Sequence, residues 1–323
     1  MTITKLAWRD LVPDTESYQE LFAQPDLTKE HEFILSDTQP RLHYALEQMS
    51  SPWATSPFML LKAPEEAEYL TLLGDAMRQL QPKTNAVFGG QYHIAGRDVT
   101  YEPATQADGQ FAAKGEVITA NWVEAEQLFG CLRQFNGEVS LQPGLVHRAN
   151  GGVLLISLRT LLAQPLLWMR LKTVVTQQRF DWVGYDDSRP LPVSIPSMPL
   201  SLTVVLTGDR ESLADFQEME PELAEQAVYS EFEDNIQIAD ADDMAQWCQW
   251  VMAVAERFAL PSPAEDAWPG LIREAVRYTG DQETLPLCPL WIGKQLREVD
   301  VISGNGPFTG EQLSQMLAQR EWR

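Results

Sequence analysis

Hydrophobic positions in the first half of the chain follow two patterns, which are short continuous runs and recurrence at helical spacing. A compact apolar run at 57–61 predicts a core strand, and apolar residues recur at helical spacing from 65 to 80. Residues 37–40 offer a helix start before another apolar face. A second continuous apolar run, at 153–156, follows the turn residues Asn150-Gly151-Gly152. Such a run is typical of a strand that is buried on both faces of a parallel sheet.

Shorter segments lie between and after these elements. Alternating residues interrupted by Gly and Asp predict a small β insertion near 87–120, which includes a segment at 117–120. We expect a helix at 122–134, a loop at 143–149 and an apolar strand at 202–206. Prolines hold 188–200 extended. Pro165 suits the first turn of a further helix, whose inward stripe is Leu167, Leu171, Val174 and Val175.

From residue 241 to the end, apolar residues recur at spacings of three and four, and Thr309 caps the last helix. A chain of 323 residues exceeds the usual size of one domain. The predicted fold class is α/β, with a parallel sheet flanked by helices and followed by a small all-helical domain. The expected parts are an N-terminal extension at 1–36 with a short helix near 16–23, a large domain at 37–240, and a small lid-like domain at 241–323.

The charge of the chain restricts its partners. There are 46 acidic and 24 basic residues, a formal net charge of −22. Because such a charge repels phosphates and anionic lipids, binding to nucleic acid or to a membrane surface is disfavoured. The segment 211–256 contains no Lys, Arg or His, and predicts a solvated acidic face over a helical core.

The Cys and His residues indicate neither a disulfide framework nor a metal site. The three cysteines are far apart in the sequence, and the four histidines form no zinc-binding pattern. No apolar run approaches the ~20 residues of a membrane span, and the first residues lack the pattern of a signal peptide. We therefore expect a cytoplasmic protein without a bound metal.

Two positions carry the chemical argument. In a P-loop ATPase, acidic residues after the central strand hold Mg²⁺ and polarise the attacking water. Here Ser157 and Leu158 stand in those places, and neither can replace a carboxylate. A neutral Ser157 with no neighbouring base is interpreted as the relic of an acidic position and not as a nucleophile. The frame of a nucleotide-hydrolysis site is present without its acidic pair.

The turn after the first strand lacks the phosphate-binding residues as well. A working loop needs glycines whose N–H groups surround the phosphates, followed by a Lys and a Ser or Thr. This chain has Lys62-Ala63-Pro64-Glu65-Glu66, in which no glycine occurs, Pro64 has no N–H, and the lysine precedes the turn. The simpler interpretation is an ordinary strand–helix turn with acids near a helix N-terminus. We expect no catalytic residue and no bound ATP or magnesium.

Several segments in register resemble the bacterial Lon-like group of the Lon-type proteases. They are the run NGGVLLI at 150–156 with its flanks, LFG at 128–130, LTGDRE at 206–211 and AVRYTGDQE at 275–283. The resemblance implies an AAA+-like sheet and a helical lid domain, ATP with Mg²⁺ as family cofactors, protein substrates, homo-oligomers, and a following Ser–Lys peptidase domain. That peptidase domain is absent from this sequence, which is either a truncated piece or a naturally short form.

The leading hypothesis is an inactive AAA+-like module that takes part in substrate recognition or oligomeric assembly beside such a peptidase. The arginine finger of related ATPases is missing after the second core strand, and Arg210 is expected to pair with Asp209 or Asp215. One alternative is a free-standing acidic adaptor or inhibitor. Another is an active ATPase with an unrecognised phosphate loop, although neither Gly89-Gly90 nor Gly304-Asn305-Gly306 has the required ending.

Overall fold

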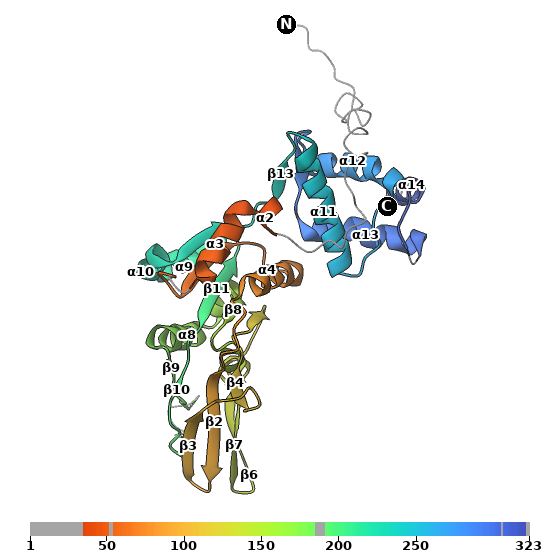
Figure 1. Ribbon diagram of the computed structural model, residues 1–323. Helices are drawn as coiled ribbons and strands as arrows, with labels where there is room; N and C mark the ends of the chain where they lie inside the picture. The colour runs from red at the N-terminus through yellow and green to blue at the C-terminus, as the bar shows by residue number, and fades with distance from the viewer. Residues whose placement is uncertain (1–34, 52–53, 185–190, 305, 321–323) are drawn as a thin grey trace. The chain divides into compact units, whose positions relative to one another are not determined.

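The computed structural model describes residues 35–51, 54–184, 191–304 and 306–320 (Figure 1). These residues divide into two compact units. One unit is Arg41–Phe232, and the other takes in the described residues up to Pro40 together with those from Glu233 onward. The short helix expected near 16–23 lies outside the described residues.

A five-stranded parallel sheet forms the centre of the first unit. The strands lie in the order β12-β1-β11-β8-β5. The strand β8, which lies between β11 and the edge strand β5, is buried along its whole length, as its continuous apolar run predicted. The expected parallel α/β sheet is therefore confirmed. The strands are β1 (Phe58–Lys62), β5 (Val117–Ala120), β8 (Val153–Ser157), β11 (Thr203–Gly208) and β12 (Val228–Glu231).

Amphipathic helices pack on this sheet. The helix α8 begins with Pro165 in its first turn, and the predicted inward stripe of Leu167, Leu171, Val174 and Val175 is buried in the main core. The prediction for this helix is confirmed. The helices of the unit are α3 (Pro40–Ser50), α4 (Ala67–Leu80), α5 (Ala125–Phe129), α6 (Leu145–Arg148), α7 (Leu158–Ala163), α8 (Pro165–Gln177), α9 (Arg210–Met219) and α10 (Pro221–Gln226).

The β insertion is smaller than expected. A separate antiparallel sheet contains β2 (Phe88–Ala95), β3 (Asp98–Pro103) and β4 (Phe111–Ala113). The segment at 117–120, expected in the insertion, instead forms β5 and pairs with β8 in the main sheet. Alternation within so short a segment cannot tell which sheet a strand joins, because that choice depends on the distant partner strand.

The helix expected at 122–134 is wrong beyond residue 129. Gly130 ends α5 with φ of 71°, and the chain turns into the hairpin of β6 (Cys131–Phe135) and β7 (Glu138–Gln142). Asn136 and Gly137 both have positive φ, which is the geometry that favours Asn-Gly in a tight hairpin turn. The dipeptide indicates a turn in the sequence itself, but a turn alone does not show that a strand and not a helix precedes it. In addition, the expected loop at 143–149 contains the short helix α6.

The extended segment before β11 forms one small pairing within its described part. There β10 (Met198–Pro199) pairs with β9 (Arg179–Phe180) in antiparallel fashion. The part of this segment at 188–190 lies outside the described residues.

The second unit is mainly helical, but not wholly so. Two short strands pair in it, β13 (Asn235–Gln237) and β14 (Thr284–Pro286), so the prediction of helices alone from 241 is wrong at 284–286. Three residues of strand are too short to interrupt a helical spacing pattern visibly. The other elements are α2 (Leu35–Thr38), α11 (Ala241–Arg257), η2 (Glu265–Ala267), α12 (Trp268–Thr279), α13 (Pro289–Ser303) and α14 (Gly310–Arg320).

Trp247 and Trp268 are buried in this second unit, with ring centroids 6.1 Å apart. The predicted cap of the last helix is confirmed, since Gln312 donates its backbone N–H to Thr309 Oγ1 at 3.4 Å.

None of the helices in the described parts of the chain combines the length and the apolar composition that crossing a membrane requires.

Candidate functional site

The candidate site lies where three neighbouring parallel strands end. Lys62 is the last residue of β1 and is followed by the turn at 63–66. Ser157 is the last residue of β8, and Gly208 is the last residue of β11, which lies between β1 and β8. Ligands of open α/β sheets bind outside the carboxyl ends of the strands. The structure thus brings together the two positions that the sequence singled out, although 92 residues separate Glu65 from Ser157.

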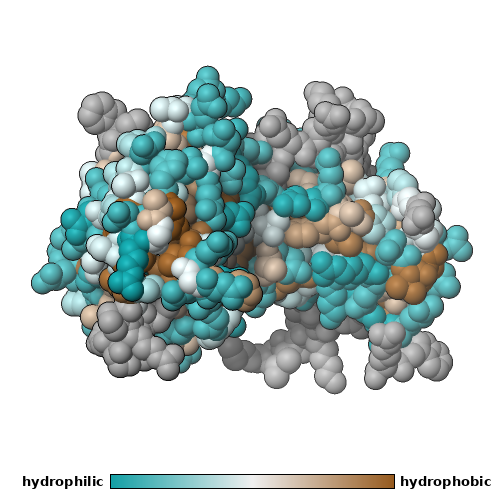
Figure 2. Space-filling view, turned by 90° about the horizontal axis from the view of Figure 1, so that it is seen from below, coloured by the Kyte–Doolittle hydropathy of each residue, from teal (hydrophilic) through white to brown (hydrophobic). Residues whose placement is uncertain are grey.

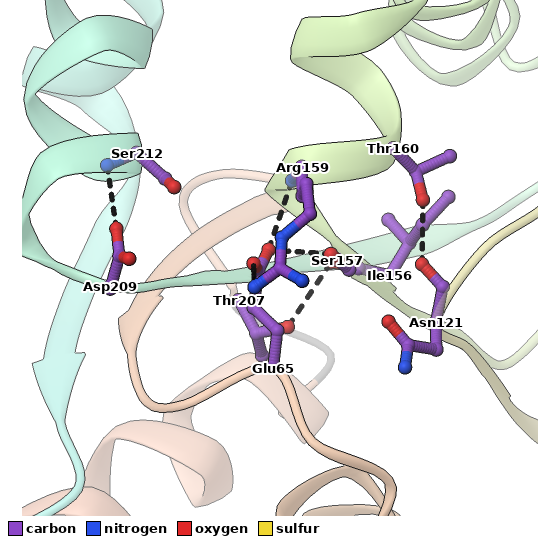
Figure 3. A network of polar contacts seen from close by, with 9 residues as sticks. All are labelled: Glu65, Asn121, Ile156, Ser157, Arg159, Thr160, Thr207, Asp209 and Ser212. Carbon is purple, nitrogen blue, oxygen red and sulfur yellow. Dashed lines mark hydrogen bonds and ion pairs between the residues drawn. The ribbon is translucent and has the colours of Figure 1, made fainter.

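Glu65 is the centre of the polar network at this edge (Figure 3). Its side chain is only 1% exposed. Its Oε1 accepts a hydrogen bond from the Ser157 hydroxyl at 2.5 Å and another from the backbone N–H of Arg159 at 2.9 Å. The carboxylate therefore joins the turn after β1 to the residues that follow β8.

Arg159 neutralises this buried carboxylate from the solvent side. Its Nη2 lies 2.9 Å from Glu65 Oε2, and the arginine side chain is 66% exposed. The contact is an ion pair without hydrogen-bond geometry, because Oε2 has no hydrogen-bond donor among the described residues. Since the arginine keeps most of its hydration, the pair avoids the cost of burying both charges.

Sequence reasoning placed Glu65 among ordinary acids near a helix N-terminus, and that interpretation is wrong for this residue. Glu66 is the residue before α4, is exposed and makes no side-chain cap bond, whereas Glu65 reaches across the sheet edge to β8. Arg159, which begins the segment after Ser157-Leu158, was overlooked. The available signal was an arginine two residues beyond Ser157, the position where the sequence analysis expected an acid.

Ser157 has an acceptor that the sequence did not reveal. The sequence showed no base near this hydroxyl, but in the structure the hydroxyl donates a hydrogen bond to the Glu65 carboxylate. Ser157 is nevertheless 0% exposed, and Leu158 beside it is also fully buried. A substrate cannot reach the hydroxyl in this arrangement, so the pair is a structural link between two strands.

Lys62 is directed to the opposite neighbour of β1. Its Nζ lies 2.6 Å from Glu231 Oε2 at the end of β12, and the Tyr229 hydroxyl donates to Glu231 Oε1 at 2.8 Å. The hydrogen bond from Lys62, followed by that from Tyr229, lowers the pKa of Glu231. Burial, followed by the hydrogen bond to Glu231, raises the pKa of Tyr229 to about 12. The lysine of the turn is thus paired with a carboxylate.

The remaining turn residues complete the packing of this edge. Ala63 is buried, and its backbone N–H donates to the carbonyl of Gly208 at 3.1 Å, which continues the contact between β1 and β11. Pro64 contributes no N–H to the site. No group of three or more His, Cys, Asp or Glu side chains is placed to hold a metal ion anywhere in the described parts of the chain.

Asp209 caps the helix that follows β11. Its Oδ1 accepts the backbone N–H of Ser212 at 2.8 Å, and the hydrogen bonds from Ser212 lower its pKa, with a smaller effect from Arg159. The expected ion pair of Arg210 with Asp209 or Asp215 is wrong, since no such pair is present among the described residues. The charge of Arg210 instead lowers the pKa of Glu231 across the edge.

The comparisons with known proteins agree with the sequence motifs. A family model described as "LonB-like, AAA domain" matches residues 114–232. A "Putative Lon protease homolog" of Escherichia coli (strain K12) is 64% identical over 323 residues, which is 100% of this chain and 55% of that protein. A protein of the same description from Haemophilus influenzae (strain ATCC 51907 / DSM 11121 / KW20 / Rd) is 38% identical over 210 residues, which is 62% of this chain and 35% of that protein. The chain thus spans about half the length of the first relative.

Among solved structures, NtrX from Brucella abortus matches with a TM-score of 0.48 and 12% identity. The match covers 83% of this chain and 51% of NtrX. A similarity of this size carries no argument about function.

Proposed function

We propose that the chain is a non-hydrolysing AAA+-like module, because one Lon protease homologue matches it over its full length and a LonB-like AAA domain model matches residues 114–232. In this proposal the module takes part in recognising protein substrates or in assembling oligomers. The substrates would be cleaved by the Ser–Lys peptidase domain that the resemblance implies. The module uses neither bound ATP nor bound magnesium.

The buried carboxylate of Glu65 is the observation that carries this proposal. It occupies the edge between β1 and β8, where the γ-phosphate of a hydrolysing relative would need space and positive charge. Two like charges 4 Å apart repel by about 4 kcal/mol at an effective dielectric constant near 20. An incoming phosphate would have to displace Glu65 from Ser157 and Arg159.

The other groups at this edge do not fit a Mg-nucleotide either. Ser157 is neutral and fully buried, and Lys62 is already paired with Glu231. The turn before α4 has no glycine and includes Pro64, so it cannot surround phosphate oxygens with backbone N–H groups. Hydrolysis depends on the electrostatic stabilisation that such groups supply. These residues support a scaffold in which an internal carboxylate takes the place of the nucleotide.

Thermal unfolding of the chain with and without Mg-ATP, and with a non-hydrolysable analogue, tests the proposal. We expect no change in the unfolding temperature. A nucleotide that binds only the folded chain at 100 times its dissociation constant would add about 2.7 kcal/mol to the free energy of unfolding. A stabilisation of that order, reproduced by the analogue, would overturn the proposal.

The role of Glu65 itself is tested by a matched pair of variants. Glu65→Ala removes the acceptor of the Ser157 and Arg159 hydrogen bonds, and we expect it to lower the free energy of unfolding by about 1.5–3 kcal/mol. Glu66→Ala removes an exposed carboxylate from the next position and serves as the control, with an expected change within about 0.5 kcal/mol. Equal effects of the two substitutions would show that Glu65 does not hold this edge together.

A further inference from the structure

Three Asn-Gly dipeptides occur in the sequence, and the structure gives two of them opposite surroundings. Asn136-Gly137 forms the turn between β6 and β7, and Asn150-Gly151 lies just before β8. The asparagine of the third, Asn305, lies outside the described residues. Asparagine before glycine loses its side-chain amide readily, because glycine has no side chain to hinder attack by its own backbone nitrogen on the amide carbon. Each dipeptide is therefore a potential site of chemical modification.

The dipeptide at the hairpin turn is open to this reaction. Asn136 and Gly137 are both exposed at the end of the β6–β7 hairpin (Figure 1). Among the described residues nothing hydrogen-bonds to the Asn136 side chain, and a Cβ added at Gly137 would meet no heavy atom within 4 Å. The neighbouring Phe135 is 78% exposed, so few contacts hold the tip closed. Such a tip opens at low free energy, and the nitrogen can then approach the amide carbon while the rest of the chain stays folded.

The dipeptide before β8 is held at both reacting groups. Asn150 is 2% exposed, its Nδ2 donates to the carbonyl of Pro199 at 3.2 Å, and its Oδ1 accepts the backbone N–H of Ser201 at 2.9 Å. The attacking atom would be the Gly151 nitrogen, which donates to the carbonyl of Ser201 at 2.6 Å. The amide and the nitrogen can therefore meet only when the start of β8 separates from the segment before β11.

We propose that Asn136 is a site of spontaneous deamidation in the folded chain, whereas Asn150 is protected. The backbone nitrogen of Gly137 bonds to Cγ of Asn136 and loses its proton. The Cγ–Nδ2 bond breaks, and the side-chain nitrogen leaves with that proton as ammonia, so that a five-membered succinimide ring remains. Water then opens the ring. Its attack at Cγ gives aspartate on a normal backbone, and its attack at the main-chain carbonyl carbon gives isoaspartate, in which the chain continues through Cγ.

The isoaspartate product is expected to open the hairpin tip. Its backbone contains one additional atom, so the turn of two residues no longer keeps Phe135 directly opposite Glu138. The reaction thus converts a tight turn into a loop. It needs only water and involves no nucleotide, so this inference does not depend on the proposed function.

Incubation of the purified chain for several weeks at physiological temperature and pH, followed by peptide mapping with mass spectrometry, is the first test. Deamidation at Asn136 is expected to be at least about a hundredfold faster than at Asn150, because Asn150 reacts only through unfolding. In urea, where the native contacts are lost, the two rates should agree within about threefold. An unmodified Asn136, or equal rates at the two positions in the folded chain, would overturn the inference.

Limited digestion with trypsin measures the effect on the hairpin. Arg133 is exposed in β6, and cleavage after it requires the paired strand to open. This cleavage should be severalfold faster after the incubation than before it. Arg97 is exposed in the turn between β2 and β3 and is the internal control, since its cleavage should not change.

Two variants separate the backbone change from the new charge. Asn136→Asp carries the charge on a normal backbone, and Asp is tolerated in such turns, so fresh variant should be cleaved after Arg133 like the fresh unsubstituted chain. Asn136→Gln cannot form the five-membered ring, and incubation should not accelerate its cleavage. If isoaspartate forms at the turn and cleavage after Arg133 stays unchanged, the expected opening of the hairpin is wrong.

Discussion

At the scale of single residues, His147 is a titratable side chain enclosed by aromatic rings. It is 1% exposed, and its ring centroid lies 4.2 Å from that of Phe180 and 5.6 Å from that of Trp182. The backbone N–H of Gly144 donates to Nδ1 at 3.0 Å, while Nε2 has no hydrogen-bond partner among the described residues. Burial, with a smaller contribution from the charge of Arg170, lowers the pKa of His147 to about 3.

This histidine is expected to make the chain less stable in mild acid. In the unfolded chain a histidine gains a proton below about pH 6.5, while folded His147 stays neutral down to about pH 3. Its contribution to stability is therefore fully present above pH 6.5 and is lost as the pH falls. Between pH 7 and pH 5, the loss should reach about 2 kcal/mol.

Urea unfolding of the unsubstituted chain and of His147→Gln at both pH values measures this contribution. Gln cannot titrate, so the variant should lose about 2 kcal/mol less between the two pH values, whatever its stability at pH 7. Parallel losses in the two proteins would contradict the prediction and would show that acid acts through other groups.

At the scale of elements, the entry into β8 depends on a glycine. Gly151 has φ of +78°, and a Cβ placed there would lie 2.1 Å from the ring of Phe88. The Gly151 N–H also donates to the carbonyl of Ser201 at 2.6 Å, next to the start of β11. The backbone conformation and the close approach of Phe88 both exclude a side chain at this position.

Gly151→Ala is expected to destabilise the chain more than Gly137→Ala does. Gly137 has φ of +85°, and a Cβ added there would meet no heavy atom within 4 Å, so alanine should cost only the ~1–2 kcal/mol of a left-handed backbone. At Gly151 the contact with Phe88 should add about 1–3 kcal/mol of overpacking. Chemical denaturation of the two variants compares the costs, and equal values would mean that Phe88 moves aside without penalty.

At the scale of the whole molecule, charge is unevenly distributed. The segment 211–256 has no basic residue, and exposed carboxylates recur along α9, as at Glu211, Asp215 and Glu218. Hydrophilic residues cover most of the face in Figure 2, with separate hydrophobic areas between them. A net charge of −22 destabilises the compact state through repulsion among its own carboxylates.

Moderate salt is therefore expected to raise the unfolding temperature of the chain, because screening weakens this repulsion. Glu225→Gln should stabilise the chain by a few tenths of a kcal/mol and Arg97→Gln should destabilise it by a similar amount, since both side chains are exposed and their removal changes the net charge in opposite directions. Differential scanning calorimetry at low and physiological salt gives both comparisons. Shifts of the same sign for the two variants would exclude repulsion as their cause.

Several features could be predicted from the sequence because they depend on neighbouring residues. The continuous apolar run at 153–156 was enough to predict the buried strand β8, and Ser157-Leu158 after it led to the prediction that its acidic pair is missing. The stripe of α8 follows from helical spacing in the same way. Motifs of a few residues also indicated the relation to Lon-type proteases.

Tertiary structure decided which distant groups meet. Whether 117–120 joins the insertion or the main sheet depends on pairing with β8, and the end of α5 depends on the hairpin that follows it. Glu65 looked like its neighbour Glu66, and only the fold directs one carboxylate to Ser157 and Arg159 while the other remains in solvent. Periodicity and turn chemistry act over a few residues, whereas the partners of a buried carboxylate are selected by the packing of strands that are far apart in the chain.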